Sequence, residues 1–197
     1  GYVLWNDNNG TIPALDDATW AYPSLLKSED AGETWSDVIS IELSGEDGID
    51  GVKNFLTDEQ IAEYWEEPVP TRDELLFGTY WINSDIAVDA WGNPHICAMV
   101  LVVGPGLDPG FYLSPEPCKT LFDIYSIDED NTDWQGVKLG NANTIEGEFI
   151  YPGSDPLTEA NRFGVTSSND GQYMFFTWAD TRLEGVEENT SPDLYAR

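Results

Sequence analysis

Basic residues are scarce in this chain of 197 residues. It has 8 lysines and arginines against 37 aspartates and glutamates, which gives a net charge of −29. Nucleic acids and anionic membrane surfaces are therefore poor partners, because binding them requires clustered Lys and Arg side chains. Two interpretations of the acid excess stay open: it keeps the protein soluble, or it supplies oxygen ligands for divalent cations.

Histidine and cysteine are also rare. The single histidine, His95, gives little support to a zinc site of several histidines or to a Ser-His-Asp triad, and we expect it only to flank a strand. The two cysteines, Cys97 and Cys118, have 20 residues between them and match no metal-ligand spacing. Two alternatives stay open for this pair: one disulfide in an oxidising compartment, or two free buried thiols.

Long hydrophobic runs are missing too. The longest, 96–103, has the length of a strand and is shorter than the roughly 18 residues of a membrane span, so we expect no membrane insertion. Aromatic residues are abundant, with eight Trp, nine Tyr and eight Phe. Such a composition indicates a folded chain rather than a disordered acidic tail.

One stretch has a readable turn pattern. Residues 28–35 have the form S-x-D-x-G-x-x-W, with Ser28, Asp30, Gly32 and Trp35 at the defining positions. The pattern predicts a hairpin turn in which Asp30 accepts backbone N–H bonds and Gly32 takes a positive φ. We expect Trp35 to fold back as a hydrophobic plug.

Alternation and turn signals predict a series of strands and one short helix, which begins at a capping box of Thr57 and Gln60. The predicted strands cover 1–7, 22–27, 38–43, 85–90, 95–103, 120–126, 136–139, 163–167, 172–180 and 193–196. Three pieces recur: 123–125 (DIY) as 193–195 (DLY) after 70 residues, Gly92 as Gly171 after 79, and Trp5 as Trp178 after 173. Antiparallel four-stranded units repeated in this way are typical of β-propeller blades.

The fold class that we predict is therefore all-β, as a partial propeller of about two and a half blades with one acidic helical insertion. The predicted boundaries are a partial blade at 1–43, the insertion at 44–78, a full blade at 79–150 and a partial blade at 151–197. Closing a propeller takes at least about four blades, so we expect a fragment of a longer chain, with the ring completed by that chain or by another.

The turn at 28–35 matches the Asp-box, and the stretches 169–182 and 192–197 are similar to a blade of the sialidase-like (BNR-repeat) propellers of secreted bacterial proteins. The resemblance implies a propeller fold and a location outside the cell or on its surface. A second candidate box at 126–134 is degenerate, since Asp130 lies four residues before Trp134 instead of five and no glycine stands at the turn.

Sialidases of this family use three arginines, a Tyr–Glu pair and an acid/base Asp. The Arg-Ile-Pro tripeptide that usually carries the first arginine is missing, and the four arginines present are Arg72, Arg162, Arg182 and Arg197. No catalytic residue is carried over, so whether the protein is an enzyme stays open.

Two further kinds of site are candidates. Asp128, Asp130 and Thr132 present oxygens at alternating positions like the opening of a calcium loop, without the expected Gly and final Glu; the alternative is a solvated acidic turn. Tryptophans in or beside predicted loops are candidates for stacking on sugar rings. They are Trp20, Trp65, Trp81 and Trp91, whereas Trp5, Trp35, Trp134 and Trp178 are expected to fill cores.

We therefore expect a non-catalytic propeller segment of a large secreted or cell-surface bacterial protein, for glycan or surface binding, adhesion or display. It requires no cofactor, although Ca²⁺ is one option. The alternative is part of an exo-α-sialidase or related glycoside hydrolase whose active site is completed by other blades. Expected partners are further blades, glycans, or secretion and surface machinery.

Overall fold

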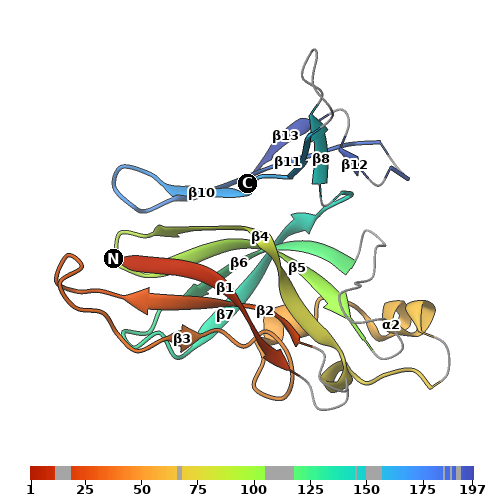
Figure 1. The fold of residues 1–197 in the computed structure, drawn as a ribbon, viewed down its shortest axis with the longest axis horizontal. Coiled ribbons are helices and arrows are strands. Elements are labelled where there is room, and N and C mark those ends of the chain that lie inside the picture. The colour runs from red at the N-terminus through yellow and green to blue at the C-terminus, as the bar shows by residue number, and fades with distance from the viewer. Residues whose placement is uncertain are drawn as a thin grey trace.

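The computed structural model describes residues 1–11, 19–65, 68–104, 118–144, 146–149, 157–183, 185–186, 188–189 and 192–197. Within them the chain forms mainly antiparallel β-sheets, with two short α-helices and one 3-10 helix (Figure 1). The all-β prediction is confirmed. The described sheets do not close into a ring or a barrel.

The central sheet has four antiparallel strands in sequence order. They are β4 (Leu76–Val88), β5 (Pro94–Val103), β6 (Lys119–Ser126) and β7 (Trp134–Asn141). Strand β5 is apolar on both faces: Ile96, Ala98, Val100 and Val102 enter one core, and Cys97, Met99 and Leu101 enter another. A strand buried on both sides gives a nearly continuous apolar run, which is why the sequence predicted β5 well.

A three-stranded sheet lies on each side of the central one. The N-terminal sheet contains β1 (Tyr2–Thr11), β2 (Thr19–Lys27) and β3 (Ile39–Ser40). The C-terminal sheet contains β10 (Gly164–Ser167), β11 (Met174–Asp180) and β13 (Asp193–Ala196). A small sheet of β8 (Glu146–Phe149), β9 (Leu157–Ala160) and β12 (Glu188–Asn189) completes the molecule, with β12 parallel to β8.

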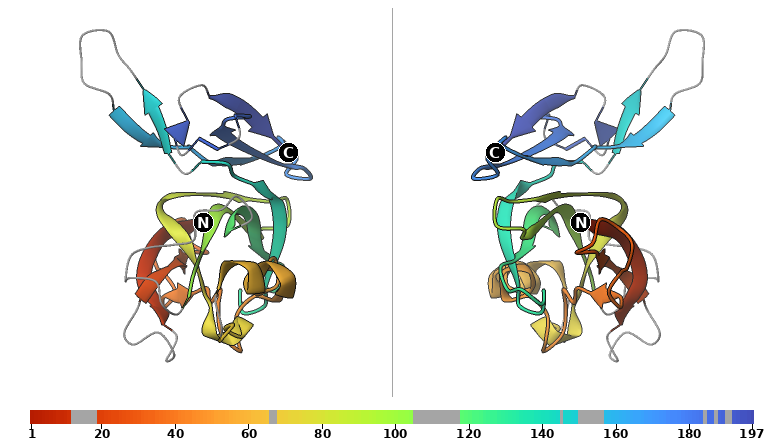
Figure 2. Two further views of the ribbon diagram at one scale, coloured as in Figure 1. Left: turned by 90° about the vertical axis from the view of Figure 1, so that its right-hand side faces the viewer. Right: turned by 90° about the vertical axis from the view of Figure 1, so that its left-hand side faces the viewer.

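Two hydrophobic cores join these layers. The first core packs Leu25 and Ile41 of the N-terminal part against Phe77 and Phe122 of the central sheet. The second core packs Met99 and Leu121 of the central sheet against Phe176 and Trp178 of the C-terminal sheet, among others. Figure 2 shows the C-terminal sheet (blue) as a layer on one side of the central sheet, away from the N-terminal sheet (red) and the helices (orange).

The helical segment packs into the first core. Helix α1 (Asp50–Lys53), helix α2 (Asp58–Tyr64) and the 3-10 helix η2 (Arg72–Glu74) precede the central sheet. Buried side chains from this segment are Ile49, Val52, Leu56 and Ile61. The predicted capping box of α2 is confirmed: the Gln60 N–H donates to the Thr57 hydroxyl at 3.2 Å, and the Thr57 N–H donates to Gln60 Oε1 at 2.9 Å. Helix α1 was not predicted.

The strand predictions differ from the structure at the ends of several strands, and β8, β9 and β12 were not predicted. The predicted strand 38–43 pairs only over Ile39–Ser40, and the predicted strand 85–90 is the second half of the longer β4.

The recurring glycines Gly92 and Gly171 both occupy hairpin turns with positive φ, 91° and 69°. In β6, however, Ile124 enters the first core, whereas in β13 it is Tyr195, not Leu194, that packs toward the central sheet. The side-chain directions of segments 123–125 and 193–195 are therefore shifted by one residue relative to their match in sequence.

Candidate functional site

The predicted turn at 28–35 forms a network of side-chain hydrogen bonds. The Ser28 hydroxyl donates to Asp30 Oδ1 at 2.9 Å, and Thr34 donates to the same carboxylate from its N–H at 2.8 Å and its hydroxyl at 2.6 Å. Gly32 has a φ of 91°. The bonds from the Thr34 hydroxyl and N–H lower the pKa of Asp30 to about 2. These predictions for Asp30 and Gly32 are confirmed, but Trp35 is 44% exposed and is not a buried plug.

A second turn of the same kind connects β6 to β7. Ser126 donates to Asp128, which also accepts the Thr132 N–H at 2.8 Å, the Thr132 hydroxyl at 3.0 Å and the Asp133 N–H at 2.9 Å. Ser28, Asp30 and Thr34 have the same spacing as Ser126, Asp128 and Thr132. The carboxylate of this turn is therefore Asp128 and not Asp130. Asn131 has a positive φ of 54°, one position later than Gly32 relative to the serine of its turn. We call the two segments, 28–35 and 126–134, the Ser-Asp-Thr turns.

This geometry bears on the calcium interpretation of Asp128, Asp130 and Thr132. Both carboxylate oxygens of Asp128 already accept hydrogen bonds, and the Thr132 hydroxyl donates to one of them. A cation bound here would have to displace donors that hold the turn together. In the part of the chain that the structure describes, no group of three or more His, Cys, Asp or Glu side chains is arranged to hold a metal ion.

The second Ser-Asp-Thr turn makes stability depend on pH. Burial opposes ionisation of Asp128, but the donors Ser126, Thr132 and Asp133 hold its pKa below the usual value of about 3.9. A carboxyl group whose folded pKa is depressed stabilises the protein above its unfolded pKa, and that contribution is lost as pH falls through the folded pKa. We expect Asp128→Asn to lower the free energy of unfolding by about 1 kcal/mol at pH 6, after discounting for solvent, and by progressively less from about pH 4 downward.

Urea unfolding of the wild type and of Asp128→Asn at a series of pH values measures this difference. Relief of general charge repulsion in acid affects both proteins alike and cancels. The control is Asp130→Asn, which removes an exposed carboxylate from the same turn and is expected to change stability little. A difference between wild type and Asp128→Asn that does not change with pH would contradict the argument.

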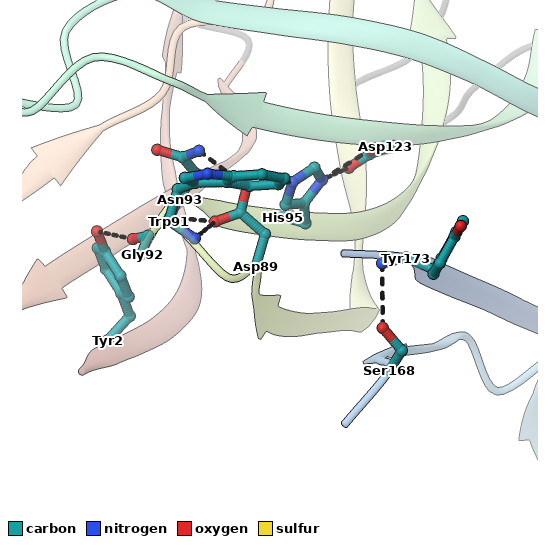
Figure 3. A network of polar contacts seen from close by, with 9 residues as sticks. All are labelled: Tyr2, Asp89, Trp91, Gly92, Asn93, His95, Asp123, Ser168 and Tyr173. Carbon is teal, nitrogen blue, oxygen red and sulfur yellow. Dashed lines mark hydrogen bonds and ion pairs between the residues drawn. The ribbon is translucent and has the colours of Figure 1, made fainter. Parts of the chain in front are cut away.

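A row of aromatic side chains follows one edge of the three face-packed sheets. We call Tyr2, Trp91 and Tyr173 the aromatic edge; they come from the start of β1, the β4–β5 turn and the β10–β11 turn (Figure 3). Trp91 is 72% exposed and Tyr173 is 65% exposed. The Ala90 N–H donates to Gly171 O at 2.9 Å, which joins the two turns, and the Tyr2 hydroxyl donates to Gly92 O at 3.2 Å.

The turn that carries Trp91 is organised by Asp89. Asp89 Oδ1 accepts the N–H groups of Trp91 at 2.9 Å and Asn93 at 2.8 Å, and Oδ2 accepts the Asn93 side-chain amide at 2.8 Å. Burial acts to raise the pKa of Asp89, but these donors leave it lowered overall. The backbone under Trp91 is therefore fixed although its ring is free in solvent.

His95 lies beside this turn (Figure 3). Its Nδ1 is 3.0 Å from both carboxylate oxygens of Asp123, its Nε2 is 3.8 Å from Asp89 Oδ2, and its ring stacks on Tyr125. The expectation that His95 only flanks a strand was too simple, because the imidazole links β5 to β6 and supports the Asp89 turn. The side chain is only 13% exposed, which suits a structural role.

The other candidate tryptophans differ from Trp91 in their location or in their burial. Trp65 is half-buried against the first core, and a Cβ at Gly104 would lie 2.3 Å from its ring, so Trp65 is a packing residue. Trp20 and Trp81 lie on β2 and β4 rather than in loops, and their side chains are outside the described residues. Trp178 is buried in the second core as predicted. Of the two sugar-stacking candidates whose side chains the structure describes, Trp65 and Trp91, it is Trp91 that is exposed to solvent.

The two cysteines are free thiols in the structure. Cys97 belongs to the second core and Cys118 to the first, so they lie on opposite faces of the central sheet. A disulfide requires Cα atoms within about 7 Å on converging side chains, which this placement does not provide. Burial raises the pKa of each thiol to about 12, so neither is a reactive nucleophile.

Three of the four arginines, Arg72, Arg182 and Arg197, make polar contacts in separate parts of the fold. Arg72 donates to Leu56 O and Asp58 beside α2, Arg197 donates to Leu139 O of β7, and Arg182 forms an ion pair with Asp193 at 3.2 Å. Each serves a different part of the fold.

No helix in the described residues is long and apolar enough to cross a membrane. A scan of family models, a search of curated proteins and a search of solved structures each found no match to this chain.

Proposed function

We propose that this chain is a non-catalytic segment of a β-propeller that binds neutral glycans at its aromatic edge. The observation that carries the proposal is the pair of exposed rings, Trp91 and Tyr173, on neighbouring turns that the Ala90–Gly171 hydrogen bond holds together. Sugar rings present C–H faces that stack on exposed aromatic side chains, and a fixed backbone lowers the entropic cost of binding.

The propeller part of the proposal rests on the sheets. The central sheet is a four-stranded antiparallel meander, and the N-terminal and C-terminal sheets pack face to face on its two sides. A Ser-Asp-Thr turn precedes the last strand of both the N-terminal and the central sheet. Radial repetition of such sheets is the construction principle of propellers, in which further blades of the same protein or of another chain would complete the ring.

The net negative charge of the protein favours neutral glycans over anionic ones. With 37 acidic residues against 8 basic ones, the protein repels anionic sugars such as sialosides, and Asp170 stands exposed in the turn that carries Tyr173. The separate positions of Arg72, Arg182 and Arg197 also argue against a sialidase. The proposal also places the protein on the outside of a bacterial cell, where glycans are plentiful. Its role there is adhesion or display.

Replacement of Trp91 tests the proposal. We expect Trp91→Ala to weaken binding of a neutral oligosaccharide about tenfold, because it removes the most exposed stacking surface of the edge. Titration calorimetry with maltohexaose, cellohexaose and chitohexaose measures this. Leu194→Ala removes an 80% exposed apolar side chain from β13 and should leave binding unchanged. Equal affinities of wild type and Trp91→Ala would refute the assignment of the edge.

A further inference from the structure

An open groove of about 530 Å³ lies between the two Ser-Asp-Thr turns. The second of these turns also touches the aromatic edge, because the Tyr2 hydroxyl lies 3.2 Å from Asn131 Oδ1. The groove is lined by residues that include Lys27, Glu29, Trp35, Ile39, Glu129 and Asp130, and we call it the inter-turn groove. Its volume falls within the range of roughly 300–1,000 Å³ that is typical of small-ligand sites. We propose that the inter-turn groove is a second carbohydrate site, which holds one neutral sugar unit against Trp35. The ligand class rests on the proposed function.

The two turns place their tryptophans in different surroundings, and the side chain of Trp35 is the more exposed of the two. Trp35 is seven residues after Ser28, whereas Trp134 is eight residues after Ser126. Trp134 is the first residue of strand β7, whereas Trp35 lies before β3 in a segment without regular secondary structure. Trp134 packs against the first core and its indole N–H donates to Asn131 O at 2.9 Å, whereas Trp35 is 44% exposed and lines the groove.

Polar groups that suit sugar hydroxyls surround this ring. Lys27 Nζ spans the two turns, since it lies 2.9 Å from Glu29 Oε1 and donates to Glu129 O at 2.8 Å. These contacts use two of its three N–H donors. Carboxylates of Glu29, Glu129 and Asp130 are acceptors for hydroxyl hydrogens. An aromatic surface with a few donors and acceptors at its rim is the usual make-up of a site that orients a polar ring.

The charges in the groove favour a neutral saccharide over an anionic one. One lysine faces three carboxylates, Glu29, Glu129 and Asp130, so a uronate or sialyl group would meet net repulsion. The lysine is already paired with Glu29, which leaves it a hydrogen-bond donor rather than an unpaired cation. Hydroxyl groups can both donate to the carboxylates and accept from the ammonium group.

The test is an NMR titration of the wild-type protein with maltohexaose, cellohexaose and chitohexaose. We expect the indole N–H resonance of Trp35 to shift on addition of at least one of them. Trp35→Ala should weaken the corresponding affinity about tenfold, and Trp91→Ala should leave the Trp35 shift in place. Glu129→Gln, at an exposed position, provides a second variant that keeps the turn intact and should weaken binding several-fold.

The outcomes separate this proposal from the previous one. Loss of binding confined to Trp91→Ala, with no movement of the Trp35 resonance, overturns the groove and retains the aromatic edge. Loss confined to Trp35→Ala and Glu129→Gln supports the groove and overturns the edge. Reduced stoichiometry in each single variant supports both sites, and a wild type that binds none of the saccharides overturns both.

Discussion

Replacing Asp180 with alanine is expected to lower the free energy of unfolding by about 3 kcal/mol. Asp180 is only 2% exposed, and its carboxylate accepts four hydrogen bonds. The donors are the N–H groups of Asn143 at 2.8 Å, Thr144 at 3.2 Å and Thr181 at 2.8 Å, and the Thr144 hydroxyl at 2.9 Å. Removing the carboxylate leaves buried donors without a partner, which is the costly way to lose a hydrogen bond.

Urea unfolding followed by tryptophan fluorescence measures this loss. Asp170→Ala is the matched control, because Asp170 also accepts side-chain and backbone bonds in a turn, from Ser168 and Gln172, but it is exposed. Its replacement should cost much less. If Asp180→Ala were no more destabilising than Asp170→Ala, the buried network between the end of the central sheet and β11 would not hold the C-terminal sheet in place.

The second large effect is expected for Gly171→Ala, which should also lower the free energy of unfolding by about 3 kcal/mol. Gly171 has a φ of 69°, and a Cβ there would lie 2.5 Å from the Ala90 nitrogen. The methyl group would therefore push apart the two turns that the Ala90–Gly171 hydrogen bond joins. Both the contact and the left-handed backbone contribute to the loss.

Gly92→Ala separates the two contributions. Gly92 occupies the corresponding hairpin turn of the central sheet with a φ of 91°, but a Cβ there has nothing within 4 Å. Only the conformational cost of about 1 kcal/mol applies. Thermal and urea unfolding of both variants check the comparison. Equal losses would mean that the close approach of the turns does not matter for stability.

Sequence reasoning was most successful where a local pattern determines local structure. Strand β5 was found because its apolar run is buried on both faces, and the start of α2 was found from its capping box. In the first Ser-Asp-Thr turn, Asp30 and Gly32 behave as predicted because a few adjacent backbone groups fix the whole motif.

The second turn was misread because the comparison was anchored on tryptophan. Asp130, four residues before Trp134, was compared with the Asp-box aspartate, whereas counting forward two residues from Ser126 selects Asp128, which is the residue that makes the hydrogen bonds. The serine and threonine spacing was the available signal. The expectation that Trp35 would be buried came from the S-x-D-x-G-x-x-W pattern alone, and the 44% exposure of its side chain contradicts it.

Other features could not be predicted from local patterns, because they depend on contacts between residues that are far apart in the sequence. The contact of His95 with Asp123 joins residues 28 positions apart and depends on the register of β5 against β6. The separation of Cys97 from Cys118 by the central sheet likewise follows from strand pairing and from which face each side chain takes. The packing of the helical segment into the first core depends on Gly51 and Gly136, where a Cβ at Gly51 would lie 2.1 Å from Gly136 O.

The central claim, that this protein binds neutral saccharides without cleaving them, is tested most directly in one sample. Maltohexaose, cellohexaose and chitohexaose are each added to the labelled wild-type protein, the Trp91 and Tyr173 resonances are followed by NMR, and the saccharide is then analysed by chromatography. The account predicts that both resonances shift with at least one of the three and that every saccharide is recovered intact. Shortened products, or resonances that do not move with any of the three, would contradict it.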